Sequence, residues 1–303
     1  MDETPYNPWP LFDYPKFQST GYLLHMAMQL IGKLKLATPF EPHWANVPIW
    51  LTTRGLTTGI IPYERGAYSI NIDLIDHSIK ITTQSGQYYD FKLHQMSVAQ
   101  FADNLLSILR VLNINIPINP MPQEIPNPIA FDKDLEQRYY DEDLANVWWR
   151  ILLSTYCVLR QYRAHFDGEN PGIGLMWGTF DLRDARYNGV AVPTTGINAG
   201  YIRRNAMNEG QVEAGWWAGS EAYPQPAFFS FTYPQPAGIE NAKIQPAYAR
   251  WDAKMAVFIL DYADLLKSPH PEQDLLDFFN STYRVGTELA GWDSRFLTSG
   301  KPI

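Results

Sequence analysis

The segment WGTFDL, residues 177 to 182, places one carboxylate in an otherwise aromatic and apolar stretch. If the segment is a strand, alternate side chains share a face. One face then carries Trp177, Thr179, Asp181 and Arg183, and the other carries Phe180 and Leu182. A carboxylate that faces a lined cavity is partly desolvated, and desolvation shifts its pKa. We therefore expect Asp181 to act as a general acid or base or as a ligand anchor; the alternative is a structural partner of an arginine or of backbone amides.

Two arginines and one histidine are further polar candidates. Arg54 and Arg186 carry forked donors that suit a carboxylate or phosphate of a ligand, although an internal ion pair with Asp181 or Asp184 explains them equally well. His43 follows a proline-containing turn and precedes a strand, a position where functional residues accumulate. We predict that Asp181, His43 and Arg186 are catalytic and that Arg54 contacts the substrate.

Aromatic side chains are the second signal, because they make up 14% of the chain. Many lie in or beside predicted strands, where they can line an apolar pocket or form an ordinary aromatic core. The aromatic residues that we expect to contact a substrate are Trp44, Trp177, Phe180, Trp216 and Trp217.

Several classes of function are disfavoured. The motifs of nucleophile-elbow hydrolases, zincins and P-loop proteins do not occur, and neither a metal site nor a cofactor is predicted. Cys157 is the single cysteine and cannot form an internal disulfide. A net charge of -8 argues against binding to nucleic-acid phosphates. No stretch is apolar enough for a membrane helix and the first residues do not resemble a signal peptide, so we expect a cytoplasmic protein with no membrane contact.

Helical and strand patterns alternate along the chain. Apolar spacing predicts helices over residues 17–37, 97–112, 141–166 and 271–289. Runs typical of strands cover residues 49–58, 68–75, 79–83, 88–93, 177–182, 212–217, 228–233 and 255–260, of which the first four predict an antiparallel meander. Five prolines between Pro117 and Pro128 predict an extended connector.

The order of these elements predicts an α+β fold made of two related halves. Residues 1–116 form a helix–meander–helix half, residues 117–130 the connector, and residues 131–303 a helix–strands–helix half, packed together as one compact unit. An internal duplication with pseudo-twofold symmetry explains the repeated order, and aligning Trp50 with Trp177 then places Arg54 opposite Asp181. Chance alternation of helices and strands is the other interpretation.

Several separate segments also resemble those of an uncharacterised bacterial family, known only as a domain of unknown function, whose members have nearly this length. The matching segments are Trp9–Pro10, His43–Trp44, RGLTT at 54–58, Ile61–Tyr63, PMPQEIPNPI at 120–129, WGTFDL with Arg186, AGWW at 214–217, STY at 281–283 and GWD at 291–293. The resemblance brings no activity with it.

The same resemblance implies three histidine positions that this chain does not keep. The family pattern has histidine three residues before the motif tryptophan, a His–Glu pair before the AGWW segment and another histidine before the last strand region. This chain has Gly174, then Asn208 with Glu209, then Arg250 at those places. If the family histidines form a metal or acid–base site, this chain has lost that site.

Taken together, the residues favour a protein that binds a small, largely apolar or aromatic molecule, or a cofactor-independent enzyme that acts on one by isomerisation, cyclisation or hydrolysis. A non-enzymatic interaction or scaffold protein is the alternative. In it, the two PQPA segments at 224–227 and 234–237 frame a surface for a partner or a homodimer. A metal-dependent enzyme is the third hypothesis.

Overall fold

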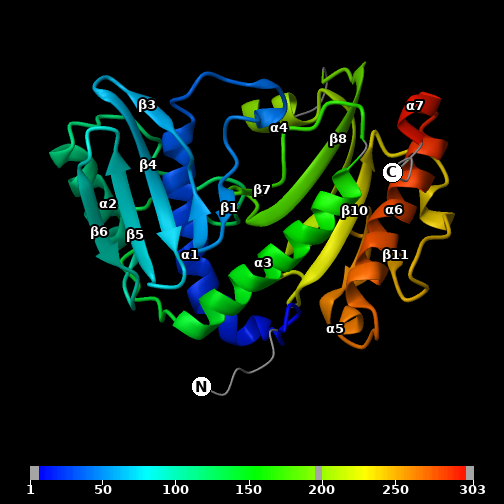
Figure 1. Cartoon of the computed structure of the whole chain (residues 1–303), viewed down its shortest axis with the longest axis horizontal. Coiled ribbons are helices and arrows are strands. Elements are labelled where there is room, and N and C mark those ends of the chain that lie inside the picture. The colour runs from blue at the N-terminus through cyan, green and yellow to red at the C-terminus, as the bar shows by residue number, and fades with distance from the viewer. Residues whose placement is uncertain (1–6, 165, 195–199, 298–303) are drawn as a thin grey trace.

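Two antiparallel sheets and the helices packed on them form the protein, an α+β fold (Figure 1). The computed structural model describes residues 7–164, 166–194 and 200–297. Each sheet has six strands within these residues. The predicted fold class is therefore confirmed.

The first sheet contains the predicted meander. Its order is β1-β2-β4-β5-β6, and β3 pairs with β4. The strands are β1 (Trp50–Thr52), β2 (Gly55–Thr57), β3 (Ile61–Tyr63), β4 (Gly66–Asp73), β5 (Ser78–Thr83) and β6 (Tyr88–Lys92). The run predicted as one strand at 49–58 is a tight hairpin of β1 and β2, with Arg54 in its turn.

The second sheet has the order β11-β12-β10-β9-β8-β7. Its strands are β7 (Gly174–Met176), β8 (Asp181–Ala191), β9 (Glu209–Trp217), β10 (Ala227–Tyr233), β11 (Arg250–Asp252) and β12 (Val257–Asp261). Ile49, the residue before β1, forms an isolated antiparallel bridge with Leu175 of β7. The two sheets therefore meet beside the two aligned tryptophan segments.

The long helices begin at residues suited to helix starts. The side chain of Asp13 caps α1 (Tyr14–Lys35), and that of Asp141 caps α3 (Glu142–Arg163). Ser97 and Gln100 form the predicted capping box of α2 (Val98–Val111). The remaining helices are α4 (Tyr201–Ala206), α5 (Tyr262–Leu265), α6 (Pro271–Leu289), α7 (Ser294–Leu297) and the single 3-10 turns η1 (Pro42–Trp44) and η2 (Ile239–Asn241). No described helix combines the length and the apolar character needed to span a membrane.

Helices α3 and α6 cover one face of the second sheet, while α1 contacts both α2 and α3 (Figure 1). Buried apolar side chains from both sheets and from these helices form one continuous hydrophobic cluster. Because every second residue of a strand points away from these helices, the opposite face of the second sheet is free to line a pocket.

The internal duplication is not confirmed. The two sheets differ in strand order, and the pairing that the duplication predicted does not form. Arg54 pairs instead with Asp73 at 2.7 Å and with Asp76 at 2.8 Å, within the first sheet. Asp181 begins β8 of the second sheet.

The prediction that residues 177–182 form one strand is wrong. They form the turn between β7 and β8 followed by the start of β8. The amide of Phe180 donates to the carbonyl of Met176 (2.8 Å), and Phe180 has a φ of 62°. This left-handed conformation reverses the chain direction. It is uncommon for a residue other than glycine, so the residue type does not predict it. The Phe180 ring nevertheless packs against α1 and α3, the core side to which alternation assigned it together with Leu182.

Candidate functional site

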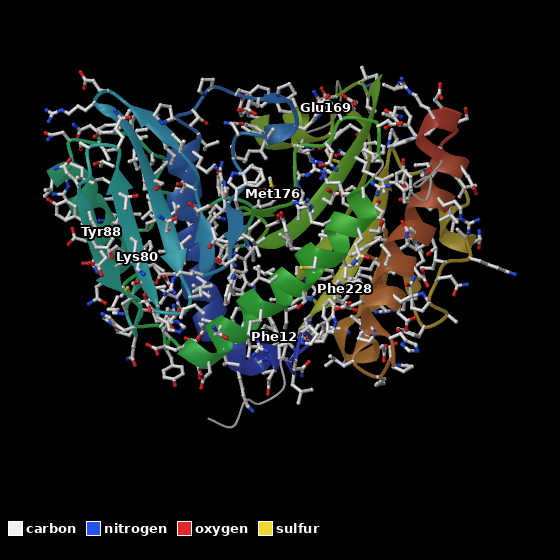
Figure 2. The ribbon with its side chains drawn as sticks, in the orientation of Figure 1. Phe12, Lys80, Tyr88, Glu169, Met176 and Phe228 are labelled. Atoms are coloured by element: carbon white, nitrogen blue, oxygen red, sulfur yellow. The ribbon has the colours of Figure 1, made fainter. Side chains whose placement is uncertain are left out.

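A pocket of about 590 Å³ lies on the face of the second sheet that α3 and α6 leave uncovered. Met176, one of its lining residues, lies near the centre of the molecule (Figure 2). The apolar lining residues are Leu36, Trp44, Val47, Met176, Trp177, Tyr201, Ile202, Ala206, Met207, Trp217, Phe229, Phe231, Met255 and Val257. A concave, mostly apolar site of this size is typical of small-molecule binding.

Four of the five charged side chains in the pocket lining are gathered in one part of it, and the fifth, Arg203, comes from α4. Asp181 and Arg183 come from β8, Glu213 from the neighbouring β9, and Glu124 from the proline-rich connector. Arg183 Nη1 donates to Glu213 Oε1 at 2.6 Å, and Arg183 Nη2 donates to the carbonyl of His43 at 3.4 Å. The Thr179 hydroxyl donates to Asp181. Arg183 is thus engaged by Glu213, which leaves Asp181 without an arginine or lysine ion pair among the described residues.

Burial dominates the electrostatics of these groups. Dense packing around the Asp181 carboxylate raises its pKa to about 6, with further increases from Glu213 and Glu124 and opposing effects of Thr179 and Arg183. The carboxylate keeps some solvent access, because the pocket opens beside it. Burial also raises the pKa of Glu124. Burial alone would lower the pKa of Arg183, but Glu213 raises it above the ordinary value. The Asp181 carboxyl, with its pKa at about 6, therefore changes its protonation state close to neutral pH.

The turn before β8 and the connector fit together through a glycine. A Cβ at Gly178 would lie 2.0 Å from Glu124 Oε2, so a side chain at this position would displace the carboxylate. Glu124 itself has a φ of 58°. The WGTFDL and PMPQEIPNPI segments, distant in sequence, therefore build one part of the pocket.

Helix α1 holds both of these segments. Gln29 is fully buried; its amide nitrogen donates to the carbonyls of Gln123 (2.7 Å) and Gly178 (3.2 Å), and its amide oxygen accepts from the Gln123 amide (3.1 Å). His25 Nε2 lies 3.1 and 3.0 Å from the carbonyls of Trp177 and Gly178. Both of these partners are acceptors, whereas the Gln29 amide nitrogen, 3.3 Å from the same atom, can only donate. Burial lowers the pKa of His25 to about 4, so the ring is neutral at physiological pH.

A second wall of the pocket comes from η1 and α4. Trp44 Nε1 donates to the Ile202 carbonyl at 3.1 Å, and the Trp44 and Tyr201 rings meet edge to face with centroids 5.4 Å apart. Both rings belong to the pocket lining. The η1 turn and helix α4 therefore form one wall of the pocket.

Of the predicted site residues, the structure brings Asp181, Trp44, Trp177 and Trp217 to the pocket. Arg54 does not reach it, because it is bound to Asp73 and Asp76 and its side chain is 51% exposed on the first sheet.

Two other predicted residues lie on the helix-covered face. Arg186 is buried with its guanidinium 3.6 Å from the ring centroid of Tyr162 and 4.3 Å from that of Tyr283, and it donates to the Tyr162 carbonyl. Trp216 is fully buried against Phe12, on the face opposite Trp217. Strand alternation explains both placements. Arg186 is three residues from Arg183 and Trp216 is one residue from Trp217, and both of these neighbours line the pocket.

Phe180 is turned into a ring stack instead of the pocket. It stacks on His25 (4.7 Å between centroids) and on Trp148 (5.1 Å). Trp148 in turn stacks on Phe17 at 6.2 Å. The positive φ of Phe180 directs the ring toward α1 and α3, where it helps to fix the turn that ends at Asp181.

The sequence analysis missed Arg183, Glu213 and Glu124 as site residues. Arg183 shares strand parity with Asp181, and Glu213 is a charge within an apolar run, so both carried the same kind of signal as Asp181. Glu124 lies in a proline-rich connector and carried no such signal. Its role depends on tertiary packing against Gly178.

His43 faces a different set of residues from Asp181. Its Nε2 lies 3.5 Å from Glu169 Oε2 and 3.4 Å from Glu209 Oε2, and its ring stacks on Tyr187. The side chains of His43, Glu169 and Glu209 could hold a metal ion. Their wide separation in the chain hid them from an analysis based on ligand spacing.

Comparison with known proteins places the chain in one family. The model of DUF5996, a family of unknown function, matches residues 9–299, and the chain belongs to this family. The resemblance inferred from the sequence segments is thereby confirmed. No curated protein and no solved structure shows a significant match.

Proposed function

We propose that this member of DUF5996 binds a small, largely apolar or aromatic molecule in the pocket and that Asp181 transfers a proton to or from it. One observation carries the proposal: a carboxylate with its pKa raised to about 6 lies in the lining of a mostly apolar pocket of about 590 Å³. A group that titrates near the working pH can serve as either a base or an acid. Cofactor-independent isomerisation, cyclisation or hydrolysis suits such a group.

The other charged residues support this assignment of roles. Glu213 engages Arg183, so the arginine is fixed in place on the same sheet face as Asp181. Its positive charge can stabilise an anion that develops on a bound molecule. Glu124 offers a second carboxyl group with a raised pKa for the partner proton. Arg183 thus takes the role that the sequence analysis gave to Arg54 and Arg186.

The proposal also covers the setting in which the protein works. We infer a cytoplasmic protein whose partner is a small molecule rather than nucleic acid. The net charge of -8 supports the second part, because phosphate binding depends on clustered basic residues.

Binding of a neutral apolar dye tests the pocket directly. Nile red fluorescence should rise on titration with the protein and show one site. Ala206 lines the pocket, so Ala206→Phe should fill part of it and weaken dye binding by at least about tenfold. Ala253 is exposed and lies outside the lining, and Ala253→Phe is the matched control with unchanged affinity. Equal dye affinity in wild type and Ala206→Phe would contradict the pocket assignment.

The natural ligand can be sought without guessing its identity. Protein purified gently from cells is examined by native mass spectrometry for a bound small molecule, which Ala206→Phe should fail to retain. Any compound found is then incubated with wild type and with Asp181→Asn. Turnover by wild type that is lost in Asp181→Asn, while binding remains, supports the enzyme. If both proteins bind the compound and neither converts it, the protein only binds its ligand, and the proton-transfer role of Asp181 is contradicted.

A further inference from the structure

Three side chains able to bind metal ions converge beside the end of β8, apart from Asp181. His43 comes from η1, Glu169 from the loop before β7, and Glu209 from the first position of β9. One ligand atom from each lies within 4.8 Å of the others. Glu169 lies toward the end of the molecule that carries α4, away from Met176 at the centre (Figure 2).

The fold positions each of the three residues separately. The His43 ring stacks on Tyr187 with centroids 3.6 Å apart and planes 16° from parallel. The Tyr187 amide donates to the Glu169 carbonyl at 3.0 Å, so the loop is fixed beside the same tyrosine. Glu209 Oε1 accepts from the Gly189 amide at 2.6 Å, and its other oxygen faces His43. The cluster is therefore a product of sheet and loop packing rather than a chance meeting of mobile side chains.

The charges of this cluster are uncompensated by lysine or arginine. Among the described residues, neither Glu169 nor Glu209 forms an ion pair with a lysine or an arginine. The His43 side chain is 3% exposed, its Nδ1 has no hydrogen-bond partner in the described part of the chain, and its Nε2 faces the two carboxylates. A buried imidazole aimed at two carboxylates is costly unless a cation or a shared proton satisfies it.

The spacing of the ligand atoms suits a metal ion. Zn²⁺ binds nitrogen and oxygen at about 2.0–2.2 Å, so neighbouring ligands of a tetrahedral ion lie about 3.4 Å apart. The two distances from His43 Nε2 are 3.4 and 3.5 Å. Glu169 is 58% exposed, which leaves a side from which an ion and water can enter. Imidazole suits zinc and iron, and carboxylates suit manganese.

We propose that His43, Glu169 and Glu209 bind a divalent first-row transition-metal ion. The site stands independently of the ligand proposed for the pocket. It is nevertheless connected to that pocket, because the His43 carbonyl accepts from Arg183 and the next residue, Trp44, forms a pocket wall. An ion held by His43 would restrain η1 and with it this wall.

Calorimetric titration of chelator-treated protein with Zn²⁺ and with Mn²⁺ tests the site. Wild type should bind one equivalent of at least one of these ions, and more tightly than Mg²⁺. Glu209→Gln and Glu169→Gln should each weaken that binding by at least about tenfold, because each removes one charged ligand. Glu288→Gln, an exposed change of the same type on α6, should leave it unchanged.

Folding is checked separately by circular dichroism, and the exposed Glu169 keeps the test decisive even if Glu209→Gln fails to fold. The absence of stoichiometric binding to wild type would overturn the proposal. So would equal affinities in wild type and Glu169→Gln, or a loss of affinity in Glu288→Gln as large as that in Glu169→Gln. A protonated His43 shared between the two carboxylates would then account for the cluster.

Discussion

Among the described residues, Asp181 forms no ion pair with an arginine or lysine that would offset the cost of its burial. The ion pair that would explain the charge without function is formed by Arg183 with Glu213 instead. The Thr179 hydroxyl is the one side-chain hydrogen-bond donor that Asp181 has among the described residues. A partly desolvated carboxylate left in this state is a characteristic of functional sites. Asp73 of the first sheet is in the opposite state, because Arg54 and Lys80 both pair with it.

Replacing Asp181 with asparagine should change how stability depends on pH. Its pKa is raised from 3.8 to about 6 in the folded protein, so folding binds a proton between these values. The free energy of unfolding of wild type therefore falls as pH rises from about 4 to about 6. Asp181→Asn lacks this loss and should be more stable than wild type above pH 6, by up to about 3 kcal/mol. Urea unfolding at several pH values measures the difference.

An exposed aspartate provides the control for this experiment. Asp103 is 78% exposed on α2, and Asp103→Asn should give a pH profile parallel to that of wild type. If the Asp181→Asn profile is also parallel to wild type, the carboxylate is not desolvated as described.

At the scale of elements, helix α1 positions the pocket through Gln29. The Gln29→Ala change removes hydrogen bonds to both the connector and the β7–β8 turn and leaves buried backbone groups unsatisfied. We expect a loss of about 2–4 kcal/mol in the free energy of unfolding and weaker Nile red binding. Gln18→Ala, on the exposed face of the same helix, should change neither quantity. A stable Gln29→Ala protein with unchanged dye affinity would contradict this positioning role.

The first sheet contains a carboxylate whose charge is structural. Burial alone would raise the pKa of Asp73, but hydrogen bonds from Arg54, Lys80 and two backbone amides lower it below the ordinary value. Stability from this group is therefore present above about pH 4 and is lost as pH falls further. Asp73→Asn should reduce the free energy of unfolding at pH 7 by about 1–3 kcal/mol. Urea unfolding checks this, with exposed Asp90→Asn in β6 as an unaffected control.

Element types were more predictable from the sequence than the site. Apolar periodicity located the four long helices within a few residues, because their buried faces repeat along the chain. The β7–β8 turn was missed, since nothing in the residue type announces the positive φ of Phe180. Asp181 and Trp177 were found from an unusual charge among aromatics. Glu124 and Glu169 were not, because only tertiary packing brings them to their partners.

At the scale of the whole molecule, the two halves share their interior. Helix α1 from the first half contacts α3 from the second, and Gly32 in α1 lies so close to Trp177 that a Cβ would come within 2.2 Å of the indole. The connector between the halves contributes Gln123 and Glu124 to the pocket. The pocket therefore depends on both halves and on the segment that joins them, which predicts that neither half binds the dye alone.

The shared interior also predicts cooperative unfolding. Buried apolar residues of both halves form one cluster, so opening one half exposes the packed face of the other. Tryptophan fluorescence and far-ultraviolet circular dichroism should report a single coincident urea transition. Leu30→Ala, at a site 1% exposed in α1, should shift both signals together and cost about 2–5 kcal/mol, whereas Leu11→Ala, 84% exposed, should shift neither. Two separate transitions, or a Leu30→Ala shift in only one signal, would mean that the halves fold as independent domains and that α1 stabilises only the first.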